Sequence, residues 1–380
     1  MVIIIIIPVI LLIAYYFLIG YYYAAWMHIP LYNIEQYNKT DGIKVSVIVP
    51  ARNESLVIEH CLQSLLHQHY PGDLLQIIIV DDHSDDDTAA IVSKYVSEKL
   101  KLISLNNYLE EGNIIAHKKK AIEFGIAECT GDLIITTDAD CVAGKDWINT
   151  IVDFYISHKK CFIVAPVKII PDNTALSIFQ SIDFAIMQGI TGASVYKNFH
   201  RMCNGANLAY EKQVFYAVNG FENIDHIASG DDMLLMEKIA GKFPEGIAYI
   251  KNKTAIVETL PEKSWKQFFN QRIRWASKTK HYSDKRIMAV LGLVYLLNLS
   301  LFLLLAGSII NPALFIFFVV FVFYKCIIEW AFVKDILRYF DLQAFMPVFP
   351  LFQPLHIAYI VVSGFFGSIG KYRWKGRVVK

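Results

Sequence analysis

Two long apolar regions flank a polar middle, and this arrangement limits the possible folds more than any other feature of the chain. Residues 1–26 are almost continuously apolar and contain no charged side chain. A helix needs about 20 apolar residues to cross a bilayer, so this segment is long enough. It lacks a basic start and a clear small-residue cleavage site, which favours an uncleaved anchor over a signal peptide. We therefore expect an N-terminal transmembrane anchor over residues 1–27.

The C-terminal region contains further apolar runs. Residues 287–330 form two runs separated near Asn311 and Pro312, which predicts a membrane hairpin. A last apolar stretch, residues 344–370, contains three prolines and could span the membrane, re-enter it or lie at its surface. These ends explain why the chain is 55% hydrophobic, above the value of about 45–50% for soluble proteins. We expect C-terminal membrane helices over residues 287–370.

Basic segments predict the orientation in the membrane. The segment before the hairpin, "QRIRWASKTKHYSDKR", and the tail at residues 371–380, "KYRWKGRVVK", are both basic. Basic flanks stay in the cytoplasm, so both segments are expected there, with the middle domain cytosolic and the helices in a bacterial-type inner membrane. Two cytoplasmic flanks require an even number of crossings between them. We therefore expect the proline-containing stretch to be re-entrant or to make a bent double pass.

The polar middle, residues 41–285, is long enough for one sizeable domain. The formal net charge of the chain is +1, so no global field favours nucleic acid as a partner. The 6 cysteines are scattered without C-x-x-C spacing. This pattern predicts reduced thiols rather than a disulfide framework or a zinc–cysteine site.

Strand-like and helix-like segments alternate along this middle domain. The strand-like segments are short, rich in β-branched residues and almost unbroken in hydrophobicity, as parallel strands covered on both faces should be. The alternation predicts an α/β fold with a mainly parallel sheet, and such sheets bind ligands at the carboxyl ends of their strands. The expected strands are 44–50, 74–82, 101–105, 132–140 and 161–167, and the expected helices are 54–68, 87–100, 117–128 and 145–158.

Two aspartates one residue apart, Asp138 and Asp140, end the fourth expected strand. On an extended backbone they project to the same side, where two carboxylates repel unless a proton or cation lies between them. Carboxylate oxygens are the ligands that Mg²⁺ and Mn²⁺ prefer, with substrate phosphates and water completing the coordination. The alternative is a solvated turn in which one aspartate caps the next helix.

A second acidic pair, Asp81 and Asp82, ends the second expected strand. Carboxylates at a strand end can accept hydrogen bonds from a base or ribose, so we interpret this pair as ligand-binding. The acidic residues that follow have a structural explanation, because Ser84 and Asp87 have the spacing of a helix capping box.

Two further groups carry two interpretations each. Asp231 and Asp232 open an expected helix, where they either satisfy its dipole or supply a general base. The basic run "HKKK", residues 117–120, either contacts phosphate or forms a solvated turn.

A basic and aromatic helix precedes the membrane hairpin. Gln271, Arg274 and Trp275 share one face of it, because they stand at positions i, i+3 and i+4. This face is either an interfacial anchor or a site where Arg274 binds a leaving diphosphate and Trp275 an apolar acceptor.

Taken together, the chain resembles a membrane-anchored family 2 glycosyltransferase with motifs like those of processive synthases. The resemblance lies in "VSVIVPARNE", "IIIVDD", "TTDAD", "CNGANLAY", "NGF", "SGDD" and "QRIRW", in that order. It implies a GT-A type fold, which is a Rossmann-like α/β nucleotide-diphospho-sugar transferase domain, and it places that domain at residues 41–285, ending in the interfacial helix.

The resemblance also implies roles for single residues. Asp138 and Asp140 match the family's D-x-D motif, which holds a divalent cation and the diphosphate. Asp232 matches the general base, with Asp231 beside it. Lys118 matches a lysine that usually follows glycine, whereas here it follows His117. The residues matching donor or acceptor contacts are Ala51, Arg52, Glu54, Asp81, Asp82, Lys118, Asp138, Gln271, Arg274 and Trp275.

The implied activity is inverting transfer of a sugar from a nucleotide-diphosphate sugar, with UDP as the family's commonest carrier, to a hydroxyl of a membrane-lipid or lipid-linked acceptor. Mg²⁺ or Mn²⁺ is the implied cofactor. A processive polysaccharide synthase is the alternative, although such an enzyme usually has more membrane helices. A third interpretation is a membrane scaffold that binds nucleotide-sugar without catalysis. The chain retains all the acidic residues of the family motifs, and a binding module would not need Asp232, so this interpretation is disfavoured.

Overall fold

A computed structural model of the chain describes residues 2–34, 42–110, 115–369, 372–374 and 377–379. The expected domain start at Asp41 and part of the expected tail fall outside the described residues. By internal contacts the chain divides into two units, which we describe separately. The globular unit comprises residues 30–169 and 201–260, and the helical unit comprises residues 1–29, 170–200 and 261–380.

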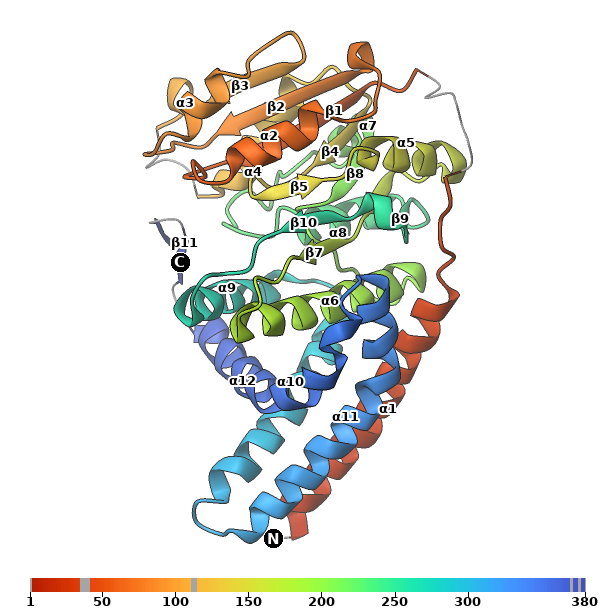
Figure 1. Ribbon diagram of the computed structural model, residues 1–380, viewed down its shortest axis with the longest axis vertical. Coiled ribbons are helices and arrows are strands. Elements are labelled where there is room, and N and C mark those ends of the chain that lie inside the picture. Colours follow the sequence, from red (N-terminus) through yellow and green to blue (C-terminus); the bar gives the residue numbers. More distant parts are fainter. Residues whose placement is uncertain (1, 35–41, 111–114, 370–371, 375–376, 380) are drawn as a thin grey trace. The chain divides into compact units, whose positions relative to one another are not determined.

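The main sheet of the globular unit has seven strands in the order β3-β2-β1-β4-β8-β6-β9 (Figure 1). β1 pairs in parallel with β2 and β4, while β8 runs antiparallel to β4 and β6. This mixed, mainly parallel sheet confirms the predicted fold class. Its strands are β1 (Val45–Ala51), β2 (Leu75–Asp81), β3 (Leu100–Ser104), β4 (Leu133–Thr136), β6 (Phe162–Val164), β8 (Leu208–Glu211) and β9 (Ile247–Tyr249).

A second sheet has the order β5-β10-β7. The segment expected as one strand at 161–167 therefore divides between two sheets, because β6 ends at Val164 and β7 begins at Val167. The strands of this sheet are β5 (Cys141–Ala143), β7 (Val167–Ile169) and β10 (Val257–Thr259). The helices of the globular unit are α2 (Ile58–Leu66), α3 (Thr88–Ser93), α4 (His117–Ala127), α5 (Trp147–His158), α7 (Lys212–Ala217) and α8 (Met233–Lys242), with short 3₁₀ turns at Gly72–Leu74, Leu105–Asn107 and Lys253–Ala255.

The helix expected at 87–100 is much shorter in the structure, where α3 ends at Ser93. The backbone N–H groups of Lys94 and Tyr95 donate to Ile91 and Val92 at 3.2 and 2.9 Å. These i to i−3 bonds tighten the last turn and end the helix. The apolar periodicity beyond this point belongs to a loop and to the start of β3.

The helical unit contains the long apolar segments. Four of them are long and apolar enough to cross a membrane: Ile5–His28, Lys285–Gly307, Ala313–Tyr339 and Gln343–Ile369. The last combines a proline-containing 3₁₀ segment, η6 (Gln343–Phe352), with a helix. The helices are α1 (Val2–His28), α6 (Ala175–Tyr196), α9 (Trp265–Ser277), α10 (Lys285–Gly307), α11 (Ala313–Tyr339) and α12 (Gln353–Ile369), with η5 (Lys278–His281) after α9 and short strands β11 (Tyr372–Trp374) and β12 (Arg377–Val379) at the end.

A buried polar network joins three of these apolar helices. Lys325 Nζ lies 2.7 Å from both Glu329 Oε1 and Gln353 Oε1. Gln353 Nε2 donates to Glu329 Oε2 at 2.7 Å, and the hydroxyl of Tyr15 also donates to Glu329. An ionisable group in an apolar bundle must be paired to be tolerated. This network therefore fixes how α1, α11 and α12 pack.

Candidate functional site

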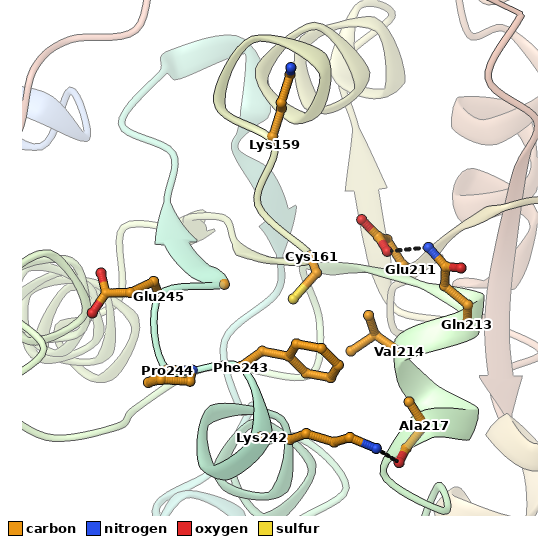
Figure 2. Close-up of a pocket in the computed structure, with 11 residues that line it drawn as sticks. Lys159, Cys161, Glu211, Gln213, Val214, Ala217, Lys242, Phe243, Pro244 and Glu245 are labelled. Carbon is orange, nitrogen blue, oxygen red and sulfur yellow. Dashed lines mark hydrogen bonds between the residues drawn. The ribbon is translucent and has the colours of Figure 1, made fainter.

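A cavity of about 690 Å³ lies in the globular unit, and no predicted site residue is among its described lining residues. Figure 2 shows Cys161, Val214 and Phe243 facing its interior. Two of its polar side chains are already engaged, because Lys242 Nζ donates to the carbonyl of Ala217 at 2.8 Å and Gln213 Nε2 donates to Glu211 at 2.8 Å. The acidic residues predicted for the site lie elsewhere, beginning at the carboxyl end of β2.

The ends of β1 and β2 lie side by side, with Ala51 in register with Asp81. The N–H of Asp82 donates to the carbonyl of Ala51 at 2.8 Å, which holds the two strand ends together. Asp81 is buried, and its Oδ1 has no hydrogen-bond partner within the described part of the chain. Burial raises the pKa of Asp81, an effect that hydrogen bonds from Ser84 partly offset. A buried acceptor without a partner is costly and fits a polar ligand group.

Arg52 braces the loop after β2. Its guanidinium donates to the carbonyls of Asp82 and His83 at 2.9 and 2.8 Å, and it lies 3.4 Å from Asp85. The neighbouring Glu54 is partly buried, and its N–H donates to Thr88 at 2.8 Å. The described contacts of Arg52 thus support the loop that carries Asp82.

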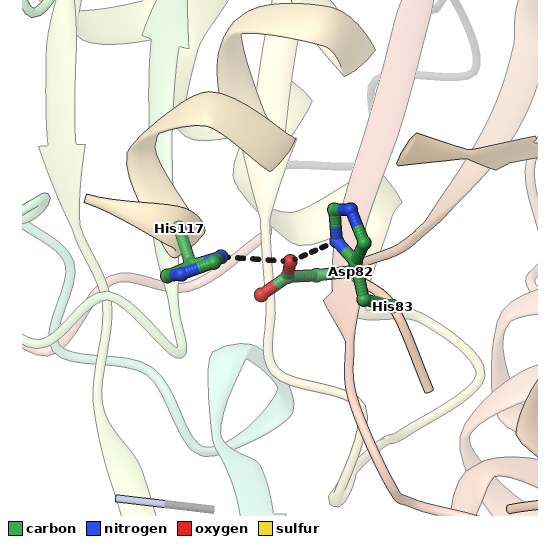
Figure 3. A group of neighbouring side chains, drawn as sticks. All are labelled: Asp82, His83 and His117. Atoms are coloured by element: carbon green, nitrogen blue, oxygen red, sulfur yellow. Dashed lines mark hydrogen bonds and ion pairs between the residues drawn. The ribbon is translucent and has the colours of Figure 1, made fainter. Parts of the chain in front are cut away.

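Asp82 lies between two imidazoles (Figure 3). Its Oδ1 is 2.9 Å from Nδ1 of His83 and 3.0 Å from Nδ1 of His117. All three side chains are buried. This cluster was not predicted from the sequence, because His117 begins α4 and is far from Asp82 along the chain.

Asp138 and Asp140 lie in the turn between β4 and β5, not on an extended strand as expected. β4 ends at Thr136, and the N–H of Cys141 donates to the carbonyl of Asp138 at 3.1 Å, which closes the turn. Both aspartates are partly exposed. The strand periodicity used to predict that they share a face therefore does not apply.

The donor atoms around this turn fit a hard cation. Burial, and then the charges of Asp140 and Asp138, raise the pKa of the Cys141 thiol well above its usual range. Mg²⁺ and Mn²⁺ in any case prefer oxygen to sulfur ligands. The carboxylate oxygens of Asp138 and Asp140 remain, and these suit Mg²⁺ or Mn²⁺.

Lys118 joins the D-x-D turn to the second acidic pair. Its Nζ lies 2.7 Å from Asp138 Oδ1 and 3.2 Å from Asp231 Oδ2. Burial alone would lower the pKa of Lys118, but the negative charges of Asp138 and Asp231 outweigh it and raise that pKa above its usual value. The side chain is therefore a fixed cation, and the basic run "HKKK" is not a purely solvated turn.

Asp232 is the N-cap residue of α8. Its Oδ1 accepts from the N–H of Met233 at 2.8 Å, and its Oδ2 accepts from the N–H of Gly205 at 3.2 Å. A side chain at Gly205 would meet Asp231 Oδ2 at 3.0 Å and Lys118 Nζ at 3.1 Å. The structure thus brings "SGDD", "CNGANLAY" and the start of α4 to one place.

Lys119 holds the loop that leads to Asp231. Its side chain is buried, with 1% exposure, and its Nζ donates to the carbonyls of Ile224, Ile227 and Ser229 at 2.6, 2.7 and 3.1 Å. These contacts satisfy backbone groups in a segment that has no regular secondary structure. The sequence gave no signal for this role, since Lys119 lies between two other lysines.

Gln271, Arg274 and Trp275 belong to α9 of the helical unit. Gln271 Nε2 donates to Glu262 at 2.9 Å, while Arg274 is partly exposed. The guanidinium of Arg272, which sequence reasoning missed, stacks on the ring of Trp275 at 4.3 Å. Both contacts, that of Gln271 with Glu262 and that of Arg272 with Trp275, lie within the helical unit.

Arg272 is buried and lies 2.9 Å from Asp183 Oδ2 on α6. Its guanidinium also lies 4.9 Å from the ring of Phe268, one turn earlier on α9. The helical spacing of Phe268, Arg272 and Trp275 could have revealed this buried face. Arg272 therefore anchors α9 to α6.

Comparisons with known proteins point to one family. Residues 46–218 match the model of "Glycosyl transferase family 2". The chain is similar to a probable glycosyltransferase, YdaM, of Bacillus subtilis, with 28% identity over 291 residues, covering 72% of this chain and 66% of that protein. It is also similar to the beta-monoglucosyldiacylglycerol synthase of Synechocystis, with 32% identity over 116 residues, covering 30% of this chain and 23% of that protein. The chain thus spans less than two thirds of the length of these relatives.

A solved structure shares the fold over nearly the whole chain. The mannosyltransferase PcManGT from Pyrobaculum calidifontis, solved in complex with GDP-Man and Mn²⁺, has 19% sequence identity and a TM-score of 0.56. The alignment covers 96% of this chain and 98% of that one. At this identity the match establishes the fold alone, and it agrees with the predicted α/β class.

Proposed function

We propose that this chain is a family 2 glycosyltransferase that moves a sugar from a nucleotide-diphosphate donor to a hydroxyl of a membrane-lipid or lipid-linked acceptor, inverting the anomeric centre. One observation carries the proposal. Lys118, Asp138 and the adjacent pair Asp231 and Asp232 converge from three separate segments of the globular unit, and Gly205, from a fourth segment, lies against Lys118 and this pair.

The nucleoside would bind at the ends of β1 and β2. The buried Asp81 Oδ1, which lacks a partner among the described residues, supports this assignment because a ribose or base N–H or O–H would satisfy it. Ala51 lies beside Asp81 in the sheet, and Arg52 supports the loop that carries Asp82. Glu54 follows on the same segment and completes the proposed donor side.

The diphosphate would bind near Lys118 and the D-x-D turn. Asp138 and Asp140 would hold Mg²⁺ or Mn²⁺, which neutralises negative charge on the leaving diphosphate. Lys118 adds a fixed positive charge beside Asp138. Without cations, a diphosphate beside these carboxylates would be repelled.

Asp232 is the proposed general base. Its neighbour Asp231 is already neutralised by Lys118, at 3.2 Å, so it is the weaker candidate. The backbone N–H groups of Gly205 and Met233 fix the carboxylate of Asp232. Asp232 takes the proton of the acceptor hydroxyl, the acceptor oxygen attacks the anomeric carbon, and the bond to the diphosphate breaks with its electron pair on the leaving oxygen.

For the helical unit, the family motif alone suggests that Arg274 contacts the leaving diphosphate and that Gln271 and Trp275 contact the substrates. The motif match in the sequence supports these roles. The contact between Trp275 and Arg272 gives Trp275 a fixed position on α9.

The acceptor class rests on the helical unit. Four candidate membrane spans suit an acceptor that already lies in the bilayer. The Synechocystis relative is named as a synthase of a glycolipid, which also favours such an acceptor. UDP is the proposed carrier, and GDP-Man, present in the similar mannosyltransferase structure, is the second donor to test. We place the globular unit in the cytosol, because basic segments flank the apolar helices.

A processive polysaccharide synthase is the second candidate, because the Gln271–Arg274–Trp275 motif is typical of such enzymes. Product length from a labelled donor separates the two. A single added sugar supports the lipid transferase, and a ladder of products supports the synthase.

The decisive experiment incubates the purified chain with a panel of nucleotide-sugars and a membrane lipid extract, followed by mass spectrometry. Asp232→Asn should reduce turnover by about 10²–10⁴-fold while donor binding persists. Near-normal transfer by this variant would refute the assignment of the base. Full activity in excess chelator would remove the role given to Asp138 and Asp140. A chain that binds nucleotide-sugar but neither transfers nor hydrolyses it would be the non-catalytic scaffold.

A further inference from the structure

We propose that Asp82, His83 and His117 form a binding site for a zinc-class divalent ion, separate from the D-x-D pair. One ligand atom of each residue lies within 4.8 Å of the others. The side chains of Asp82, His83 and His117 are 4%, 7% and 9% exposed, so the cluster is largely shielded from solvent. Two imidazoles and one carboxylate are a common protein ligand set for zinc, with a fourth position left for water.

The hydrogen bonds of His83 indicate that a proton or a metal ion lies between its Nδ1 and Oδ1 of Asp82. Nε2 of His83 lies 2.9 Å from the carbonyl of Leu109, which can only accept, so Nε2 carries the hydrogen. In the neutral ring, Nδ1 then has a bare lone pair, and this atom lies 2.9 Å from Oδ1 of Asp82. Two lone pairs at this distance repel unless a proton or a metal ion lies between them.

The surroundings of His83 are those of a metal ligand. Ligating histidines almost always donate their other N–H to a carbonyl or carboxylate, as His83 does to Leu109. Consecutive residues on a strand point to opposite faces, so Asp82 and His83 can meet only if the backbone departs from strand geometry. The φ of His83 is 56°, a left-handed value that is uncommon for residues other than glycine. Arg52 fixes this turn through the carbonyls of Asp82 and His83.

The spacing of the ligand atoms suits a zinc-class ion. Nδ1 of His117 lies 3.0 Å from Asp82 Oδ1 and Nδ1 of His83 lies 2.9 Å from it. Zn–N and Zn–O bonds of about 2.0–2.1 Å place tetrahedral ligand atoms about 3.3 Å apart. Small side-chain rotations therefore suffice to admit an ion. Imidazole ligands favour zinc, cobalt and nickel over magnesium, whereas the oxygen set of Asp138 and Asp140 has the opposite preference.

The test measures metal binding directly and needs neither donor nor acceptor, so it is independent of the proposed function. The full chain in detergent is titrated with Co²⁺ and with Zn²⁺ in the presence of excess Mg²⁺, which occupies sites made only of oxygen. Cobalt binding is followed by its visible absorption, and zinc binding by equilibrium dialysis. The variants are His117→Ala and His83→Asn, the second chosen because Asn tolerates positive φ.

Two control variants, His69→Ala and Asp138→Asn, test whether a loss of ion binding is specific to the cluster. His69 also lies beside an aspartate, with Nδ1 3.0 Å from Asp146, but this pair is exposed. We expect the wild type to bind about one ion per chain. Binding should be at least about tenfold weaker in His117→Ala and in His83→Asn. The control variants His69→Ala and Asp138→Asn should bind the ion as tightly as the wild type does. Zinc should also raise the melting temperature of the wild type but not that of His117→Ala, and a cooperative melting transition of His117→Ala without zinc shows that this variant still folds.

Three results would overturn the site. If the wild type binds no ion under excess Mg²⁺, a shared proton rather than a metal lies between Asp82 and its histidines. If His117→Ala binds zinc as tightly as the wild type, the ion is held elsewhere. Loss of binding in Asp138→Asn with retention in His117→Ala would assign the ion to the D-x-D turn instead.

Discussion

The ammonium group of Lys118 lies 2.7 Å from Oδ1 of Asp138, so the first turn of α4 supplies a positive charge to the turn that carries the D-x-D motif. The same group lies 3.2 Å from Asp231 and reduces the repulsion between two carboxylates that come from distant segments. A divalent cation that approaches Asp138 must share this carboxylate with Lys118, whereas a diphosphate meets an additional cation.

Lys118→Met should therefore shift two affinities in opposite directions. Donor diphosphate binding should weaken about tenfold or more, because a charged hydrogen bond contributes about 1.5–3 kcal/mol. Mn²⁺ binding without nucleotide should tighten, because Asp138 loses its competitor. Calorimetry with UDP and with GDP measures the first effect, and electron paramagnetic resonance of free Mn²⁺ measures the second.

Lys120→Met is the matched control, since Lys120 is more exposed and pairs with Glu123 at 2.7 Å. Both affinities should stay near those of the wild type. Weaker Mn²⁺ binding in Lys118→Met would show that Lys118 supports the metal rather than competing with it.

Lys119→Met should destabilise the globular unit and slow turnover. The substitution leaves the three carbonyls of Ile224, Ile227 and Ser229 without their buried donor. An unsatisfied buried polar group costs about 1–3 kcal/mol. We expect kcat to fall while the donor KM changes little, because the freed loop precedes Asp231 and Asp232 but not the strand ends. Thermal unfolding and steady-state kinetics check the two effects.

Lys238 provides a close control. Its Nζ also donates to three carbonyls, those of Asn219, Gly220 and Glu222, but its surroundings are more exposed. Water can replace the lost contacts in Lys238→Met, so its loss of stability should be smaller. Equal losses in the two variants would argue against a special role for Lys119.

The sequence alone could predict features that repeat with a short period or lie at strand ends. Unbroken β-branched runs predicted the parallel strands, and the rule for parallel sheets directed attention to Asp81 and Asp82. The ordered motifs indicated the resemblance to a glycosyltransferase family, with which the match over residues 46–218 agrees. Hydropathy located the four long apolar segments, although it left the topology of residues 344–370 open.

Contacts between distant segments of the chain escaped prediction. The run "HKKK" has no periodicity that separates its members, yet Lys118 enters the acidic cluster and Lys119 lies under a loop a hundred residues away. The same holds for His117 and Asp82, which meet only because α4 packs near the end of β2. Asp138 and Asp140 were expected on a strand, but strand propensity could not reveal that β4 ends before them.

Arg272 and Arg274 should differ in what they support, although they are two residues apart on α9. Arg272→Met removes the arginine partner of the buried Asp183 carboxylate, which keeps Tyr359 at 2.6 Å and His356 at 3.4 Å, and should cost about 3 kcal/mol. Burial alone would raise the pKa of Asp183, and it is chiefly the charge of Arg272 that lowers it instead. Arg274→Met removes a partly exposed side chain and should change stability by about 0.5 kcal/mol or less while lowering transfer. Thermal unfolding in detergent separates the variants.

The double variant Arg272→Met/Asp183→Asn tests the cause of the loss. Removing both charges should recover part of the stability, since no uncompensated carboxylate remains. No recovery would mean that packing of Arg272 on Trp275 and Phe268, rather than its charge, accounts for the loss.

His200 should make the helical unit less stable as the pH falls from 6.5 toward 4. Burial lowers the pKa of His200 from 6.5 to about 4. Below pH 6.5 the unfolded chain therefore binds a proton that the folded chain rejects, and stability falls by about 1–3 kcal/mol. Above pH 6.5 the ring is neutral in both states, so its contribution is constant. The apparent melting temperature of His200→Gln should depend less on pH in this window than that of the wild type, whereas His226→Gln, at an exposed histidine, should behave as the wild type does.

Gly205→Ala should lower transfer without unfolding the globular unit. The added methyl group would meet Asp231 Oδ2 at 3.0 Å and Lys118 Nζ at 3.1 Å, closer than ordinary contacts. The flexible end of Lys118 can move by a few tenths of an ångström, so the fold tolerates the change, but the ion pair with Asp231 is displaced. Because Asp232 also accepts a hydrogen bond from the N–H of Gly205, the proposed base and its neighbouring cation shift together.

Gly241→Ala, at a helical position with no atom within 4 Å of the added carbon, controls for the loss of backbone freedom. We expect unchanged melting temperatures for both variants and a fall in kcat of about tenfold or more for Gly205→Ala alone, which a displacement worth about 1.4 kcal/mol at the transition state produces. Wild-type turnover by Gly205→Ala would mean that Lys118, Asp231 and Asp232 need not hold these positions for catalysis.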